Sequence, residues 1–184
     1  LARGEKVLEQ YYALKKKDIK GEHLVELNFA KQSVMIDDAL FTGKIDMVIE
    51  NDDKEWIVVD LKTGKGFSDW DEPKLSVYDE LKLHHYRYQL MMYKLLVENS
   101  RDYRDNAVTE GVLEFTEEVA DNRIATLSLS FDSTESQNEV RRLRKLAVAV
   151  YKKIVALDFP DTSSYEETLE GIKEFEEDLI SGRI

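Results

Sequence analysis

The chain has 184 residues, of which 42% are hydrophobic and 35% are charged, a composition typical of a folded domain with a substantial core. It has no cysteine, which excludes a disulfide framework or a metal–thiolate site and fits a reducing, cytoplasmic setting. The formal net charge of -12 argues against a small basic DNA-binding module, and no apolar stretch is long enough to predict a membrane partner.

Hydrophobic periodicity and turn residues predict an α/β fold, with a mixed central β-sheet flanked by helices in one domain over 1–184. Expected helices cover 3–17, 79–98, 134–157 and 165–181, and expected strands cover 23–30, 40–50, 55–62, 111–117 and 124–131. Turns are expected near 37–38, 50–54 and 121–122, and a long loop at 64–78.

The expected strands at 40–50 and 55–62 each place a charged group in an apolar run. Asp60 and Lys62 are two residues apart and therefore project from the same face of their strand. A hairpin turn at 50–54 would put Asp46 on the neighbouring strand. Two carboxylates and an ammonium that meet on a sheet favour a divalent-cation site, whereas each group taken singly fits a surface ion pair.

Three segments follow one another in the chain. They are Gly-Lys-Ile-Asp at 43–46, Val-Asp-Leu-Lys-Thr-Gly-Lys at 59–65 and Tyr-Arg-Tyr-Gln-Leu-Met-Met-Tyr at 86–93. In this order they resemble the PD-(D/E)XK nuclease superfamily, and more narrowly its RecB-like domains, which are often fused to superfamily 1 DNA helicases. The resemblance implies a restriction-endonuclease-like core. Because the first residue is Leu, we expect the chain to be a fragment of a larger helicase–nuclease.

The resemblance also implies roles for single residues. Asp46 and Asp60 would bind Mg²⁺ or Mn²⁺, with the backbone carbonyl of Leu61 and, as an additional contact, Glu26. Lys62 would be the catalytic lysine. The implied function is metal-dependent hydrolysis of DNA phosphodiester bonds, more as an exonuclease than an endonuclease, in DNA repair and recombination.

Gln89 and Tyr93 match the family's QxxxY motif and complete the expected catalytic set. Residues four apart share a helix face, and this face would look onto the metal site. The expected partners are DNA and helicase domains of the same or a partner chain. Lys65 and Trp70, in the following loop, are candidates for contacts to a phosphate and a base, and His85 is a candidate contact at the rim of the site.

One departure from the family pattern concerns the N-terminal helix. Active RecB-like domains usually place a metal-binding His there, and the aligned position in this chain is Leu8. Glu5, Glu9 or Glu26 could substitute, or the site could operate with fewer protein ligands. The alternatives to a nuclease are a catalytically impaired domain that binds DNA or protein, and an unrelated α/β domain with a chance motif.

Overall fold

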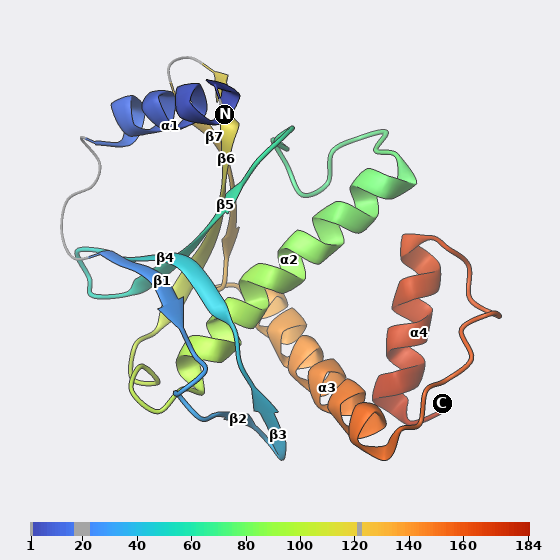
Figure 1. Ribbon diagram of the computed structural model, residues 1–184. Helices are drawn as coiled ribbons and strands as arrows, with labels where there is room; N and C mark the ends of the chain where they lie inside the picture. The colour runs from blue at the N-terminus through green and yellow to red at the C-terminus, as the bar shows by residue number, and fades with distance from the viewer. Residues whose placement is uncertain (1, 17–22, 121–122) are drawn as a thin grey trace.

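Five strands form one mixed sheet in the computed structural model, which describes residues 2–16, 23–120 and 123–184 (Figure 1). Their order across the sheet is β1-β4-β5-β6-β7. The strands are β1 (His23–Asn28), β4 (Lys44–Glu50), β5 (Trp56–Lys62), β6 (Val108–Ala120) and β7 (Arg123–Ser130). The expected mixed sheet flanked by helices is therefore confirmed.

The strand directions follow from the connections between them. β1 pairs antiparallel with β4, β4 pairs antiparallel with β5 through a short turn, and β6 and β7 also pair antiparallel. β5 and β6 are parallel, which requires a crossover, and helix α2 (Val77–Glu98) provides it. Because β5 lies in the middle of the sheet, the neighbouring residues Val58 and Val59, which point to opposite faces, are both buried.

Helix α2 lies across one face of the sheet and carries Leu83, Leu90 and Leu95 into the core. It begins after Ser76, whose side chain accepts a hydrogen bond from the amide of Asp79. The close approach of helix and sheet depends on Gly111 of β6, because a Cβ there would lie 2.9 Å from Cβ of Leu90.

The other helices lie on different sides of this framework. α3 (Thr134–Ala156) and α4 (Leu169–Ser181) pack with α2, and Figure 1 shows them apart from α1 (Ala2–Lys15). α1 contacts β6 through Glu114, which points to the face opposite that of its neighbour Leu113. α1 and α2 therefore lie on opposite faces of the sheet.

Within the described ranges, no helix is long and apolar enough to cross a membrane.

The structure corrects the expected strand at 40–50, which is two strands. β2 (Val34–Ile36) and β3 (Ala39–Phe41) form a separate hairpin around the turn expected at 37–38, and β4 begins only at Lys44. Gly43 separates β3 from β4 and lies against Leu96 of α2, where an added Cβ would be 2.6 Å from Cδ1 of Leu96.

Two helix ends also differ from expectation. α3 ends at Ala156, because Leu157 adopts a left-handed conformation as its C-cap. α4 begins only at Leu169, after the N-cap Thr168, and not at 165. The expected turn at 121–122 lies outside the described residues.

Candidate active site

The centre of the candidate site is Asp60, a carboxylate near the end of the buried strand β5 with a side chain only 4% exposed. Strand alternation places it on the same face as Val58, whose partner on β6 is Gly111. Because Gly111 contacts α2, this is the face that α2 covers. A buried carboxylate needs hydrogen-bond donors or a cation, and α2 supplies the donors.

Two side chains of α2 donate to the same oxygen of Asp60. The Tyr93 hydroxyl donates to Oδ1 over 2.6 Å, and Nε2 of Gln89 donates to Oδ1 over 2.8 Å. Nε2 of Gln89 also donates to the Tyr93 hydroxyl oxygen over 2.9 Å. The four-residue spacing places both donors on one helix face, so the orientation expected from the sequence is observed.

Lys62 connects the strand and the helix. Its Nζ lies 2.6 Å from Oδ2 of Asp60 and donates to Oε1 of Gln89 over 2.6 Å. It also lies 4.7 Å from the centroid of the Tyr86 ring, a cation–π distance. The lysine is only 18% exposed, and these three contacts fix the position of its ammonium group.

Asp46 lies on β4, next to Asp60. The pairing of Met47 with Val59, continued by one residue, puts Asp46 opposite Asp60. Oδ2 of Asp46 accepts a hydrogen bond from the backbone N–H of Leu61 over 3.0 Å. The structure therefore brings Asp46, Asp60, Lys62, Gln89 and Tyr93 into one cluster.

The environment of Tyr93 keeps its hydroxyl protonated. Burial raises the pKa of this phenol most, and the hydrogen bond to Asp60 and the negative charges of Asp60 and Asp46 raise it further. Tyr93 therefore acts as a hydrogen-bond donor at neutral pH. The influence of Asp46 on Tyr93 also indicates that both carboxylates face the same small region.

The donor set fits a hard divalent cation. Oδ2 of Asp60 is buried, accepts no hydrogen bond and forms an ion pair with Lys62. In Asp46, Oδ2 is the oxygen that accepts the hydrogen bond from the backbone N–H of Leu61. Within the described residues, no group of three or more His, Cys, Asp or Glu could hold a metal. Two carboxylates supplemented by water match the coordination that Mg²⁺ prefers, because this ion keeps several of its waters.

Of the two further expected metal contacts, Glu26 lies outside this cluster, whereas the backbone of Leu61 adjoins it. Glu26 lies on the edge strand β1 with a left-handed backbone conformation, and its exposed carboxylate pairs with Lys44. The side chain of Leu61 is 40% exposed, and its backbone N–H contacts Asp46. The roles of the Leu61 carbonyl and of Glu26 at a metal stay predictions.

The N-terminal helix supplies no described contact to the cluster. Glu5, Leu8 and Glu9 are exposed on α1, on the face of the sheet opposite Asp60. α1 is held by Glu114, which accepts hydrogen bonds from Tyr11 and Lys15. The alternatives in which Glu5 or Glu9 takes the place of a histidine in α1 therefore gain no support from the structure.

Among the other candidates, Trp70 is held by contacts within the protein. Nε1 of Trp70 donates to the Ser128 carbonyl over 2.6 Å, and its ring lies under Arg87, so it is held against the fold. Lys65 and His85 are exposed. His84 points away from the site, and its Nε2 lies 3.2 Å from Glu176 of α4.

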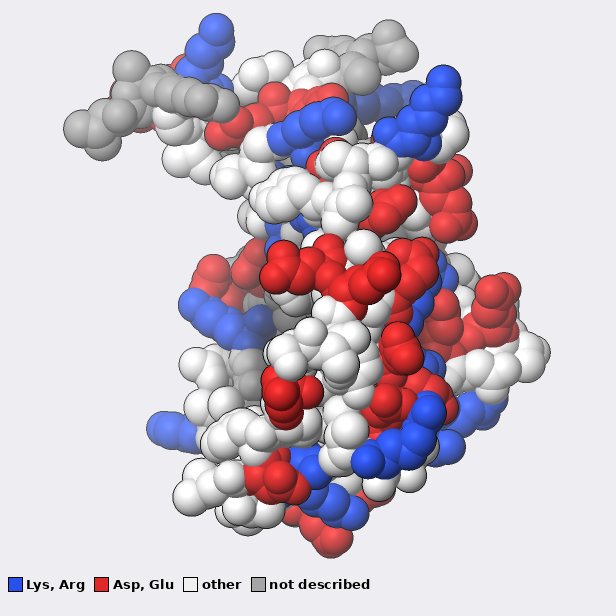
Figure 2. Space-filling model, turned by 90° about the vertical axis from the view of Figure 1, so that its right-hand side faces the viewer, with Lys and Arg blue, Asp and Glu red and all other residues white. Residues whose placement is uncertain are grey.

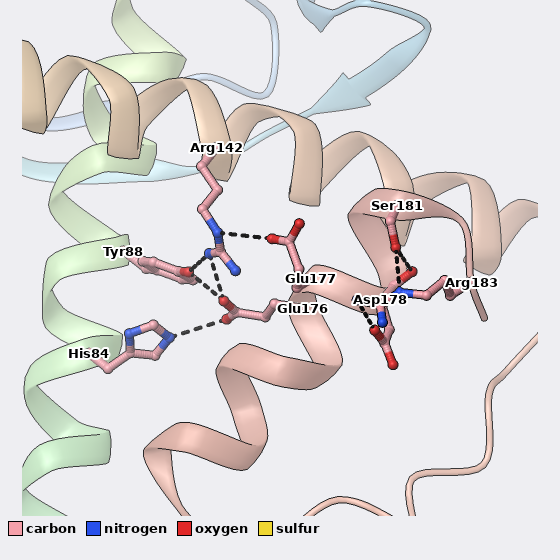
Figure 3. A network of polar contacts seen from close by, with 8 residues as sticks. All are labelled: His84, Tyr88, Arg142, Glu176, Glu177, Asp178, Ser181 and Arg183. Atoms are coloured by element: carbon pink, nitrogen blue, oxygen red, sulfur yellow. Dashed lines mark hydrogen bonds and ion pairs between the residues drawn. The ribbon is translucent and has the colours of Figure 1, made fainter.

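Sequence reasoning missed a buried polar network that attaches α4 to α2 and α3 (Figure 3). Glu176 accepts hydrogen bonds from Tyr88 over 2.7 Å and from Arg142 over 2.9 Å, and it contacts His84. Burial opposes ionisation of Glu176, but these three donors outweigh it and lower its pKa. A cavity of about 780 Å³ adjoins this network, on the side of α2 away from Asp60.

Comparison with known proteins gives a family match and several structural likenesses. No curated protein matches the sequence. The solved structure of SSO0001 is similar, with a TM-score of 0.41 and 19% sequence identity. The likeness covers 81% of this chain and 59% of the SSO0001 chain, so this chain spans less than two thirds of the length of SSO0001. The sequence profile of the PD-(D/E)XK nuclease superfamily matches residues 1–166, which include all the residues of the cluster. The chain therefore belongs to the PD-(D/E)XK nuclease superfamily.

Proposed function

We propose that this chain hydrolyses phosphodiester bonds of DNA with Mg²⁺ or Mn²⁺ at the cluster around Asp60. The observation that carries the proposal is the position of Lys62, whose ammonium lies between Oδ2 of Asp60 and Oε1 of Gln89. A largely buried lysine, in contact with a carboxylate oxygen that has no other partner, suits a site that receives a cation and an anionic substrate.

In this proposal Asp46 and Asp60 hold the cation by their carboxylate oxygens. A divalent cation supplies charge stabilisation at a phosphoryl group and lowers the pKa of a water molecule. Lys62 contributes a positive charge and N–H donors beside the carboxylates, where they orient the attacking water or stabilise negative charge on the phosphate. With the charge of Asp60 shared with a bound cation, the ammonium of Lys62 would be available for these contacts.

Gln89 and Tyr93 are positioning residues in this account. They occupy Oδ1 of Asp60 and thereby direct Oδ2 toward Lys62 and the cation. Gln89 also accepts a hydrogen bond from Lys62, so one amide fixes both the acid and the lysine. Partners of this kind set the orientation of metal ligands and of catalytic groups.

The charge distribution suggests how DNA reaches the site. Figure 2 shows acidic side chains gathered over the face that carries α4, where DNA phosphates would be repelled. The cluster lies on the other side of α2, against the sheet. We propose that helicase domains, in the same or a partner chain, deliver the strand in DNA repair and recombination, and that cutting is exonucleolytic.

The test is cleavage of a labelled linear duplex, a single strand and a circular DNA with Mg²⁺, Mn²⁺ or EDTA. We expect cutting that needs the metal, that proceeds from ends, and that falls at least about 100-fold in Lys62→Ala. Lys31→Ala, a substitution in an exposed turn, is the matched control. Cutting by Lys62→Ala at the wild-type rate would remove the lysine from the mechanism. DNA binding without any metal-dependent cutting, even with the helicase domains restored, would favour the impaired binding module.

A further inference from the structure

A second lysine extends the face of α2 that forms the site. Lys82, Tyr86, Gln89 and Tyr93 follow one another at intervals of four, three and four residues, a spacing that places all four on one side of a helix. Gln89 and Tyr93 contact Asp60, and Tyr86 contacts Lys62. Lys82 is the next position of the same stripe, toward the start of α2.

Aromatic rings hold the Lys82 side chain in place. Its Nζ lies 5.4 Å from the centroid of the Phe67 ring and 5.6 Å from that of the Tyr86 ring. Phe67 anchors the loop after β5, because it is only 4% exposed and packs against Tyr86 and Phe115. The Lys82 ammonium is therefore fixed at the junction of this loop and α2.

The ammonium of Lys82 differs from the other cations of α2 in its partners. Lys94 and Arg87 of the same helix pair with Glu98 and Glu139. In the part of the chain that the structure describes, Lys82 has no carboxylate partner, although the whole chain carries a net charge of -12. Aromatic faces attract the charge and leave the three N–H donors of an ammonium free for an anion.

Lys82 and Lys62 are close enough to serve one nucleic-acid strand. Both ammonium groups lie over the Tyr86 ring, at 4.7 Å and 5.6 Å from its centroid, so they are at most about 10 Å apart. A strand of B-form DNA carries one phosphate per 3.4 Å of axis, so this separation spans up to about three phosphates.

We propose that Lys82 is a phosphate-binding residue of the substrate subsite, which holds a phosphate up to about three nucleotides from the bond that is cut. The inference rests on the proposed function in taking a DNA strand as substrate at the Asp60 cluster. A lysine binds such a phosphate as a point charge, without a demand on base sequence. Lys82 thus sets the position of the strand and does not take part in bond breaking.

The first test compares Lys82→Gln and Lys82→Arg with wild type, with Lys31→Gln as a matched loss of one positive charge from an exposed turn. We expect Lys82→Gln to raise KM about tenfold with kcat within about twofold of wild type, and Lys82→Arg to recover most of the affinity. The slope of log affinity against log salt should become shallower by about 0.7 to 0.9 in Lys82→Gln. Lys31→Gln should leave KM unchanged.

The second test replaces single phosphates of the substrate by uncharged methylphosphonates, at each of the three linkages on either side of the cut. For wild type, one such position should cost about tenfold in KM, and the same substitution should cost Lys82→Gln nothing further, because the two changes remove one interaction. Additive losses at every position, or an unchanged KM in Lys82→Gln, would overturn the role of Lys82.

The two proposals fail in different ways. Cleavage by wild type together with wild-type KM in Lys82→Gln would overturn the subsite and leave the nuclease standing. Absence of cleavage by wild type would overturn the nuclease, and the salt slope and methylphosphonate effects measured on DNA binding would still decide the subsite. Failure of wild type to bind DNA at all would overturn both.

Discussion

The Tyr93 hydroxyl donates a 2.6 Å hydrogen bond to Oδ1 of Asp60 and thereby makes the two oxygens of this carboxylate different. Oδ1 receives two hydrogen bonds from α2, whereas Oδ2 has only the ion pair with Lys62. The proposed cation site would therefore use the oxygen that faces Lys62. A contact of this kind between strand and helix couples the fold to the geometry of the site.

Removal of this hydroxyl tests the coupling. Tyr93→Phe keeps the buried ring and leaves Gln89 as the only donor to Oδ1, so Asp60 should be less firmly oriented. We expect metal-dependent cleavage to need a roughly 10- to 100-fold higher metal concentration, with the circular dichroism spectrum unchanged. Tyr78→Phe, at an exposed position of the same helix, is the control. Equal metal dependence in both variants would show that Tyr93 does not orient the ligand.

The seating of α2 on the sheet should be sensitive to one methyl group. In Gly111→Ala the new Cβ would lie 2.9 Å from Cβ of Leu90, a fully buried residue next to Gln89 in sequence. Overpacking at this point should lower the free energy of unfolding by about 1–3 kcal/mol, measured by urea denaturation. Gly4→Ala in α1, where the added Cβ would have no neighbour within 4 Å, should be neutral or stabilising by up to about 1 kcal/mol. Equal stability of the two variants would contradict this packing.

The stability that Glu176 gives to the attachment of α4 should decrease at acid pH. Its pKa is lowered in the folded chain, so its contribution is present above the ordinary value of 4.5 and is lost as the pH falls through the lowered value. Glu176→Gln should lose roughly 2 kcal/mol of stability at pH 7 and show a smaller further loss below about pH 4.5 than wild type. Glu174→Gln, exposed on the same helix, controls for removal of a surface charge. The same acid dependence in wild type and Glu176→Gln would refute the network's role.

The central cluster could be predicted from the sequence because its parts obey local periodicities. Asp60 and Lys62 share a strand face by the two-residue repeat, and Gln89 and Tyr93 share a helix face by the four-residue repeat. The short turn between β4 and β5 fixes the partner strand, so Asp46 could be placed as well. The one relation that local periodicity does not give is the packing of α2 on β5, which brings Gln89 and Tyr93 to Asp60 and Lys62.

Features that depend on contacts between distant residues could not be predicted in the same way. The polar side chains of the α4 network come from positions 84, 88, 142 and 176, and no local pattern links them all. Glu26 has the sequence position of a ligand, but its left-handed conformation and its pairing with Lys44 depend on the edge of the sheet. Gly43, where the expected strand 40–50 divides into β3 and β4, lies against Leu96 of α2, a contact that no local pattern indicates.

The most direct test of the account is cleavage of linear DNA by the purified chain in Mg²⁺ or Mn²⁺, compared with Asp60→Asn. The amide keeps the size of the side chain and removes the charge that attracts the cation. We expect wild-type cleavage that is abolished by EDTA and reduced at least about 1,000-fold in Asp60→Asn, with metal binding lost in calorimetry. Metal-dependent cleavage by Asp60→Asn at the wild-type rate would contradict the account, because the cluster around Asp60 would then not be the site of hydrolysis.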